Sequence, residues 1–301
     1  LATPATVLDY DFESRERTVR KVQEIPSGYD RDAYVTEREM APAPDGTLVP
    51  VSIVRRKDTP LDGTAPLYLY AYGSYGHAID PYFSTARLSL LDRGWIFALA
   101  HPRGGSEMGR AWYEAGKMAH KANTFSDVVA CGRHLARTGH TADGNITVVG
   151  GSAGGLMVGA CVNLAPDLFK AGVAQVPFVD VVNTMLDDTL WLTASEFTEW
   201  GNPIADPDAY FRMKAYSPYD NVEAKAYPHM FVTGGIADPR VTYWEPAKWV
   251  ARLRDRKTDD NLIVMRMNMD AGHGGSSGRW DHLKEIAEEY AFLLMVHGTA
   301  G

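Results

Sequence analysis

The stretch Val148-Val149-Gly150-Gly151-Ser152-Ala153-Gly154-Gly155 decides the fold class of this chain. It ends an apolar run from Ile146 that is typical of a buried strand, and the small apolar residues Leu156 to Cys161 then predict a buried helix. A glycine-flanked serine between a strand and a helix is the pattern of a nucleophile elbow. Gly150 and Gly154 fit because so tight a turn leaves no room for side chains. The alternative is a glycine-rich turn whose serine does no chemistry.

Strand and helix patterns alternate along most of the chain, which favours a largely parallel sheet with helices on both faces. Together with the elbow, this alternation predicts an α/β-hydrolase fold. The expected strands cover residues 34–41, 48–56, 66–72, 95–100, 146–149, 171–176, 229–233 and 262–267. Helices are expected at residues 88–93, 125–137, 244–256 and 283–296, and a further helix is expected to begin near residue 156. Residues 185–219 are expected to be irregular.

The N-terminal residues 5–24 have the alternating polarity of a β-hairpin, followed by a linker at 25–30. A lone hairpin is marginally stable in water, so this one is expected to belong to a sheet that the chain does not contain. We therefore divide the chain into a hairpin and linker at 1–28 and a catalytic α/β domain at 29–301. The absence of an initiator methionine suggests a fragment or a processed chain.

Composition narrows the class of protein. The 301 residues are 45% hydrophobic and 23% charged, as in ordinary globular proteins. The net charge of −8 argues against a nucleic-acid partner and weakly favours a cationic one. No apolar run is long enough to span a membrane, and no signal peptide is visible. Cys131 and Cys161 lie in apolar helical contexts and are expected to be reduced core residues, which suits a cytoplasmic location.

A serine nucleophile needs a histidine base and an acid that orients it, and in this fold the acid and then the histidine follow the serine along the chain. Asp238 and His273 each follow a predicted strand, so the order Ser152, Asp238, His273 is the expected one. The sequence Asp270-Ala271-Gly272-His273-Gly274-Gly275 gives the imidazole no evident structural task. A turn role for Asp238 beside Pro239 is a competing interpretation, and Asp270 is the rival acid.

Further motifs occur in order along the chain: Tyr72-Gly73-Ser74-Tyr75-Gly76, Arg103-Gly104-Gly105-Ser106-Glu107-Met108-Gly109-Arg110, Gly150-Gly151-Ser152-Ala153-Gly154-Gly155, Gln175-Val176-Pro177-Phe178-Val179-Asp180, Glu199-Trp200-Gly201-Asn202-Pro203, Tyr216-Ser217-Pro218-Tyr219-Asp220-Asn221 and Tyr243-Trp244-Glu245-Pro246-Ala247-Lys248-Trp249. Over nearly its whole length the chain thus resembles the oligopeptidase B branch of the prolyl oligopeptidase family of serine peptidases. Members of that family carry an N-terminal β-propeller that caps the active site. The resemblance implies that the hairpin is a remnant of a propeller that is absent, removed or supplied as a separate chain.

The resemblance also implies roles for particular residues. It implies the same triad, and an oxyanion hole in which the Tyr72 hydroxyl joins the Ala153 amide. Arg240 matches a position that binds a substrate carbonyl, although a surface arginine is an equal alternative. No metal or other cofactor is implied.

The resemblance further implies endopeptidase cleavage of short basic peptides after Arg or Lys, through an acyl-enzyme. Glu196, next to Phe197, matches the carboxylate that binds the basic P1 side chain, and both residues are expected at the substrate site. Thr198, two residues after Glu196, stands where relatives often have a second acid. At the P2-facing site only the acid Asp80 remains, because Tyr82 stands where a second Asp is common. The alternatives are an esterase or aminoacyl hydrolase of the same fold, a non-catalytic interaction module, and a merely solvated Glu196.

Overall fold

A computed structural model describes residues 1–278 and 280–299. Its centre is an eight-stranded sheet with the strand order β10-β9-β8-β7-β5-β6-β4-β3. The strands from β10 to β6 run parallel, whereas β4 is antiparallel to β6 and β3 to β4. The expected α/β-hydrolase fold is therefore confirmed. The strands are β3 Tyr34–Pro42, β4 Leu48–Arg56, β5 Leu67–Tyr70, β6 Ile96–Ala100, β7 Ile146–Gly151, β8 Phe169–Gln175, β9 His229–Gly235 and β10 Ile263–Asn268.

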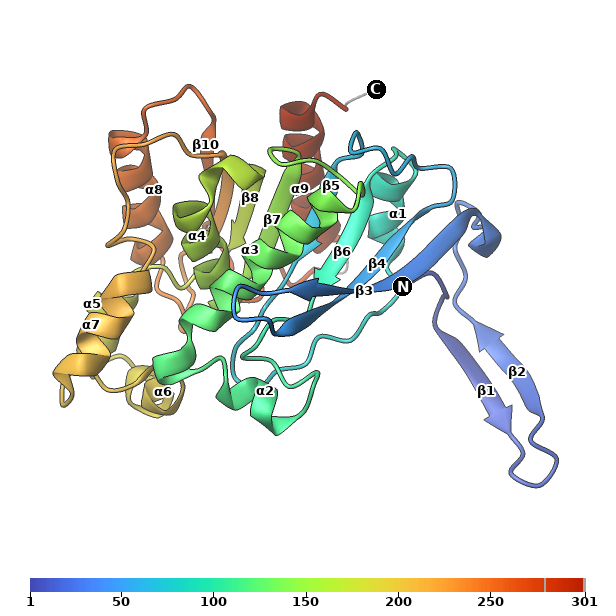
Figure 1. Cartoon of the computed structure of the whole chain (residues 1–301), viewed down its shortest axis with the longest axis horizontal. Helices are drawn as coiled ribbons and strands as arrows, with labels where there is room; N and C mark the ends of the chain where they lie inside the picture. The colour runs from blue at the N-terminus through green and yellow to red at the C-terminus, as the bar shows by residue number, and fades with distance from the viewer. Residues whose placement is uncertain (279, 300–301) are drawn as a thin grey trace.

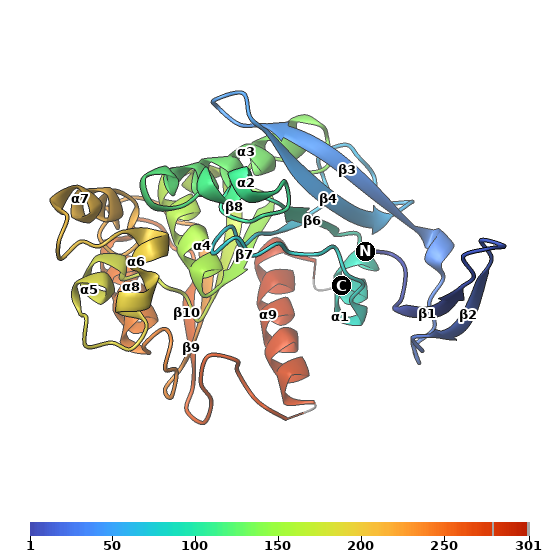
Figure 2. The ribbon, with the colours of Figure 1, turned by 90° about the horizontal axis from the view of Figure 1, so that it is seen from below.

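Helices cover both faces of the sheet, as Figures 1 and 2 show. On one face, residues of α3 (Ala122–Arg137), α4 (Ala153–Leu164) and α8 (Trp244–Arg256) join the largest apolar core. On the other face, α1 (Thr85–Leu91) and α9 (Asp281–His297) pack over a second core. The neighbouring residues Val148 and Val149 of β7 point into different cores, because successive side chains alternate across a strand. Strands buried on both faces are apolar throughout, which is why the sequence pattern located them.

The expectation of an irregular segment at 185–219 was wrong. The chain there forms three helices, α5 Val181–Leu186, α6 Thr193–Trp200 and α7 Pro207–Tyr216. The Asp206 carboxylate caps α7 and Pro207 occupies its first turn, a usual helix start. The helical pattern was hidden because α6 buries Thr193 and Glu199 as well as Trp200. A further short helix, α2 Arg110–Glu114, was not expected.

The predicted N-terminal hairpin is present as β1 (Thr6–Tyr10) paired with β2 (Arg17–Val22). It projects from the rest of the molecule in both views (Figures 1 and 2). Every residue of both strands is exposed, and the ring of Phe12 between them is 86% exposed. The hairpin therefore buries little apolar surface within this chain.

Two further sequence expectations concern the interior and the surface. Cys131 and Cys161 are both free and buried in the largest core, as expected for core thiols. None of the helices in the described part of the chain is both long and apolar enough to cross a bilayer.

Candidate active site

Ser152 stands in a sharp turn between β7 and α4. Its backbone has φ 57° and ψ −119°, a conformation that residues with a side chain seldom adopt. A Cβ on Gly150 would lie 2.4 Å from the carbonyl oxygen of Gly154, and one on Gly155 would lie 2.4 Å from Pro177. Gly154 is less tightly enclosed, with Ala71 O at 3.1 Å. The glycines thus permit the strained turn that presents the serine at the sheet edge.

The structure brings Asp238 and His273 together from two loops. The Nδ1 atom of His273 lies 2.7 Å from Oδ2 of Asp238. The other carboxylate oxygen accepts hydrogen bonds from the backbone N–H groups of Arg240 (2.8 Å) and Val241 (3.0 Å), which fix its orientation. With its proton on Nδ1 toward Asp238, the imidazole has Nε2 free to act as a base. The rival acid, Asp270, is exposed, and its backbone N–H donates to Oδ1 of Asn268.

Ser152 and His273 line one cavity of about 370 Å³, which we call the histidine cavity. No direct hydrogen bond joins their side chains among the described residues. Catalytic hydrogen bonds are often long in the absence of substrate and shorten when it binds.

A second cavity of about 310 Å³, which we call the glutamate cavity, also includes Ser152 and shares no other described residue with the histidine cavity. Tyr72, Glu196 and Arg240 line it as well. Burial raises the pKa of Tyr72 to about 12, so its hydroxyl keeps its proton at neutral pH. That hydroxyl has no partner among the described residues, and Ala153 opens α4 with its amide directly after the serine. Both groups are therefore available as hydrogen-bond donors near Ser152.

The Glu196 side chain is oriented by two neighbours. Its Oε2 accepts hydrogen bonds from Trp200 Nε1 (2.7 Å) and the Tyr75 hydroxyl (3.1 Å). Burial raises the pKa of Glu196, while these two hydrogen bonds oppose the rise. Within the described residues the other oxygen, Oε1, has no hydrogen-bond partner, and it is free for a ligand. A half-buried carboxylate with one free oxygen favours a cation in this cavity.

Two of the expected substrate residues lie outside the glutamate cavity. Phe197 packs against the largest core. Asp80 is exposed and lines a third cavity of about 390 Å³ with Tyr82 and Glu289. Glu289 also lines the histidine cavity, whereas this third cavity shares no described residue with the glutamate cavity.

A buried polar cluster behind the glutamate cavity was not foreseen. Lys121 and Glu199 are only 1% and 2% exposed, with the ammonium 3.9 Å from the carboxylate. Lys121 donates to the Gly73 carbonyl and to the Ser74 hydroxyl, both at 2.7 Å. Burial lowers the pKa of Lys121 to about 8, while Glu199 opposes the shift. Lysine is ordinarily exposed, so nothing in the sequence marked this one.

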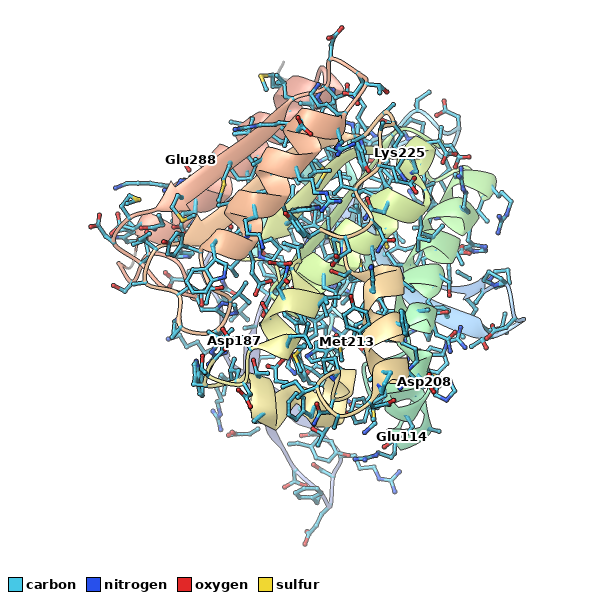
Figure 3. The ribbon with its side chains drawn as sticks, turned by 90° about the vertical axis from the view of Figure 1, so that its left-hand side faces the viewer. Glu114, Asp187, Asp208, Met213, Lys225 and Glu288 are labelled. Carbon is cyan, nitrogen blue, oxygen red and sulfur yellow. The ribbon has the colours of Figure 1, made fainter. Side chains whose placement is uncertain are left out.

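The carboxylate of Glu199 binds the same loop from the other side. It accepts hydrogen bonds from the Tyr75 backbone N–H (2.9 Å) and the Tyr113 hydroxyl (2.7 Å). Lys121 and Glu199 thus fix the loop that carries Tyr72 and Tyr75. Because its carboxylate is occupied by these contacts, Glu199 itself is not free to bind a substrate. Another nearby acid in the sequence, Asp187 after α5, is exposed at the surface (Figure 3).

Comparison with known proteins agrees with this fold. The model of the prolyl oligopeptidase family matches residues 81–299. The chain belongs to the prolyl oligopeptidase family, and its domain is the α/β-hydrolase domain of that family.

Individual relatives narrow the similarity to the oligopeptidase B type. The chain is 52% identical over 301 residues to dipeptidyl aminopeptidase BI of Pseudoxanthomonas mexicana, covering 100% of this chain and 41% of that protein. It is 53% identical over 294 residues to Protease 2 of Moraxella lacunata, covering 98% and 42%. The solved structure of oligopeptidase B from Leishmania major superposes with a TM-score of 0.95 at 47% identity, covering 99% of this chain and 42% of that one. The chain therefore spans about two fifths of the length of these relatives.

Proposed function

We propose that this chain is the catalytic domain of a serine peptidase that cleaves short peptides after Arg or Lys. The observation that carries the proposal is the free oxygen of Glu196 in a cavity that also contains Ser152 and Tyr72. A guanidinium or ammonium at this carboxylate would place the carbonyl of the same Arg or Lys residue toward Ser152. A neutral side chain would leave a half-buried carboxylate without a countercharge.

The reaction runs in two halves. Ser152 Oγ attacks the scissile carbonyl carbon while Nε2 of His273 accepts its proton and Asp238 holds the resulting imidazolium. The Ala153 amide and the Tyr72 hydroxyl donate to the oxyanion. The C–N bond then breaks, the amine leaves with the proton from His273, and the acyl group stays on Ser152 as an ester. Water adds to that ester by the same route, and Ser152 regains its proton as the acid product leaves.

The Glu196→Gln variant tests the specificity. We expect kcat/KM for an Arg substrate to fall by an amount that corresponds to a loss of roughly 2–4 kcal/mol of transition-state stabilisation. The fall for a norleucine substrate should be far smaller. Arg should be cut faster than Lys, because a guanidinium forms two parallel hydrogen bonds to a carboxylate. The measurement is steady-state kinetics on matched Arg, Lys and norleucine peptides.

The control is Asp187→Asn, which neutralises an exposed carboxylate outside the glutamate cavity. It should leave all three rates within about twofold, because the asparagine oxygen can still accept the hydrogen bonds from the Thr189 N–H and hydroxyl and an exposed charge contributes little. Equal losses for all three substrates in Glu196→Gln would contradict the proposed role of Glu196.

The name of one relative favours a second candidate function, release of dipeptides from free amino ends. Substrates with free and acetylated amino termini distinguish the two: an endopeptidase cleaves both, whereas a dipeptidyl aminopeptidase requires the free terminus. An esterase would cleave Arg esters but would not cleave the matching Arg amides. A non-catalytic module would react with no fluorophosphonate probe.

We also propose that a β-propeller, in the same polypeptide or as a separate chain, packs on the hairpin. The complete exposure of β1 and β2 supports this, since a two-stranded hairpin is marginal alone. Native mass spectrometry of protein purified from its source tests it. A mass equal to this domain alone would contradict the proposal.

A further inference from the structure

The loop that carries His273 is held differently on its two sides. Before the histidine, the backbone of the loop is bonded to the loop that carries Asp238, because the Ala237 N–H donates to the Ala271 carbonyl at 3.3 Å. After the histidine the chain passes through Gly274, where an added Cβ would meet nothing within 4 Å. The position of this second half therefore depends on the contacts that follow it.

Glu285 of α9 makes those contacts. Its Oε1 accepts hydrogen bonds from the Ser276 hydroxyl at 3.0 Å and from the Ser276 N–H at 3.3 Å. The side-chain amide of Asn268, at the end of β10, donates to the same oxygen at 3.1 Å and to the Ser276 hydroxyl at 3.0 Å. Glu285 thus joins α9 and the end of β10 to the third residue after His273.

The Glu285 carboxylate also lies directly against the backbone of the histidine loop. Gly275 has φ 71°, and an added Cβ there would lie 2.6 Å from Oε2 of Glu285. Both the backbone conformation and the close approach therefore require glycine. The charge of the carboxylate is compensated by Arg266 of β10, whose Nη1 lies 3.2 Å from Oε1. Glu285 lines the histidine cavity together with Ser152 and His273.

We propose that Glu285 is a positioning residue that holds His273 within reach of Ser152 and of the leaving amine. The imidazole is bonded to Asp238 through Nδ1 but, among the described residues, has no direct hydrogen bond to Ser152. The position of the loop therefore sets the distance over which Nε2 takes the serine proton and gives it to the amine. A displacement of about 1 Å can lower a rate by about 10²-fold. The inference rests on the proposed role of His273 as the base.

Variants of Glu285 test this role by separating kcat from KM. Glu285→Ala should lower kcat for an Arg peptide by about 10–100-fold and leave KM within about twofold, because the base moves while the glutamate cavity is unchanged. Glu285→Gln keeps an oxygen that can accept from Ser276, so it should retain at least about a third of the parent kcat. A loss confined to KM, or a Gln variant as impaired as the Ala variant, would overturn the proposal.

Ser276→Ala tests the same contact from the other side. It removes the hydroxyl bond to Glu285 and should lower kcat by about threefold to tenfold, which keeps the proposal testable if Glu285→Ala does not fold. The double variant should have the kcat of Glu285→Ala within about twofold, because both changes break one contact. An unchanged kcat in Ser276→Ala, or losses that multiply in the double variant, would overturn the proposal.

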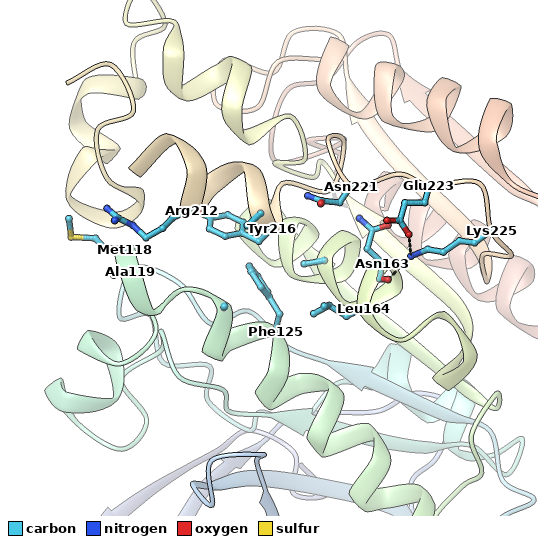
Figure 4. A pocket seen from close by; sticks show the side chains of 13 residues that line it. Met118, Ala119, Phe125, Asn163, Leu164, Arg212, Tyr216, Asn221, Glu223 and Lys225 are labelled. Atoms are coloured by element: carbon cyan, nitrogen blue, oxygen red, sulfur yellow. Dashed lines mark hydrogen bonds and ion pairs between the residues drawn. The ribbon is translucent and has the colours of Figure 1, made fainter. Parts of the chain in front are cut away.

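Two other glutamates are matched controls. Glu288, on the same helix (Figure 3), pairs with Arg266 but makes no hydrogen bond to the histidine loop among the described residues. Glu223 pairs with Lys225 at 3.4 Å in a cavity of about 410 Å³ between α3, α4 and α7 (Figure 4). That cavity shares no described residue with the histidine cavity. Alanine at either position should leave kcat within about twofold.

The rate of modification by a fluorophosphonate separates this inference from the triad itself. Ser152 Oγ attacks phosphorus and fluoride leaves, while His273 takes the serine proton, so Glu285→Ala should react about 10–100-fold more slowly than the parent. A parent protein that does not react would contradict the triad and, with it, the role of Glu285. A parent that reacts no faster than Glu285→Ala would overturn the role of Glu285 alone.

Discussion

The strain at Ser152 is held by hydrogen bonds on both sides of the residue. Its N–H donates to the Gln175 carbonyl at 2.8 Å, and its carbonyl accepts from Phe178 N–H at 3.1 Å. Such a backbone conformation destabilises the folded state by about 1–3 kcal/mol, which contacts with the neighbouring structure must offset. The glycine pattern predicted this turn. The contact of Gly155 with Pro177 was not predictable, because it joins α4 to a different strand end.

At the same scale, Tyr72→Phe should lower kcat by on the order of 10²-fold with little change in KM. The hydroxyl donates mainly to charge that exists only in the transition state. Steady-state kinetics on an Arg peptide measures both constants, and Tyr70→Phe is the matched control because Tyr70 lines neither Ser152 cavity. A loss confined to KM would show that Tyr72 contacts substrate instead.

At the scale of elements, the Lys121–Glu199 pair connects the start of α3 to α6 and to the loop after β5. Lys121→Met should lower kcat for Arg peptides by about 10–100-fold, because Glu199 is left buried without its countercharge and the Tyr72 loop loses two hydrogen bonds. Kinetics and thermal unfolding measure the effect.

The double variant Lys121→Met/Glu199→Gln separates positioning from general damage. It removes both charges, so it should recover part of the lost thermal stability while kcat stays low. Full recovery of kcat in the double variant would show that the pair does not position Tyr72.

A second buried acid joins α8 to the loop before α5. Glu245 is fully buried and accepts hydrogen bonds from the Val179 and Asp180 N–H groups and from the Thr184 hydroxyl. Burial raises the pKa of Glu245 from 4.5 to about 7, against the effect of these hydrogen bonds. Between about pH 5 and 7 the folded chain therefore keeps a proton that the unfolded chain has lost. The free energy of unfolding should fall as pH rises through this window.

The Glu245→Gln variant should show a smaller fall, with the difference from the parent amounting to about 1–3 kcal/mol across the window. Urea unfolding at several pH values measures it. Partial burial lowers the pKa of His297 to about 4, so that residue contributes in the opposite sense in both proteins and cancels in the difference. A difference independent of pH would contradict the pKa of Glu245.

At the scale of the whole molecule, the sequence predicted what depends on local pattern. The strands, the elbow and the order of Ser152, Asp238 and His273 follow from apolar runs, glycine spacing and chain order. The helices at 181–216 were missed because their buried faces include polar residues such as Glu199. The Lys121–Glu199 pair and the separation of Asp80 from Glu196 depend on contacts between distant segments, which no local pattern encodes.

The central claim, that Ser152 is the nucleophile of a working triad, has one direct measurement. The intact mass of the protein after treatment with a fluorophosphonate should increase by one adduct, which peptide mapping locates on Ser152. The Ser152→Ala variant should gain no adduct and lose nearly all turnover of an Arg peptide, since removing a triad member lowers the rate by several powers of ten. An unmodified parent protein, or a Ser152→Ala variant that keeps more than about 5% of the parent turnover, would contradict the claim.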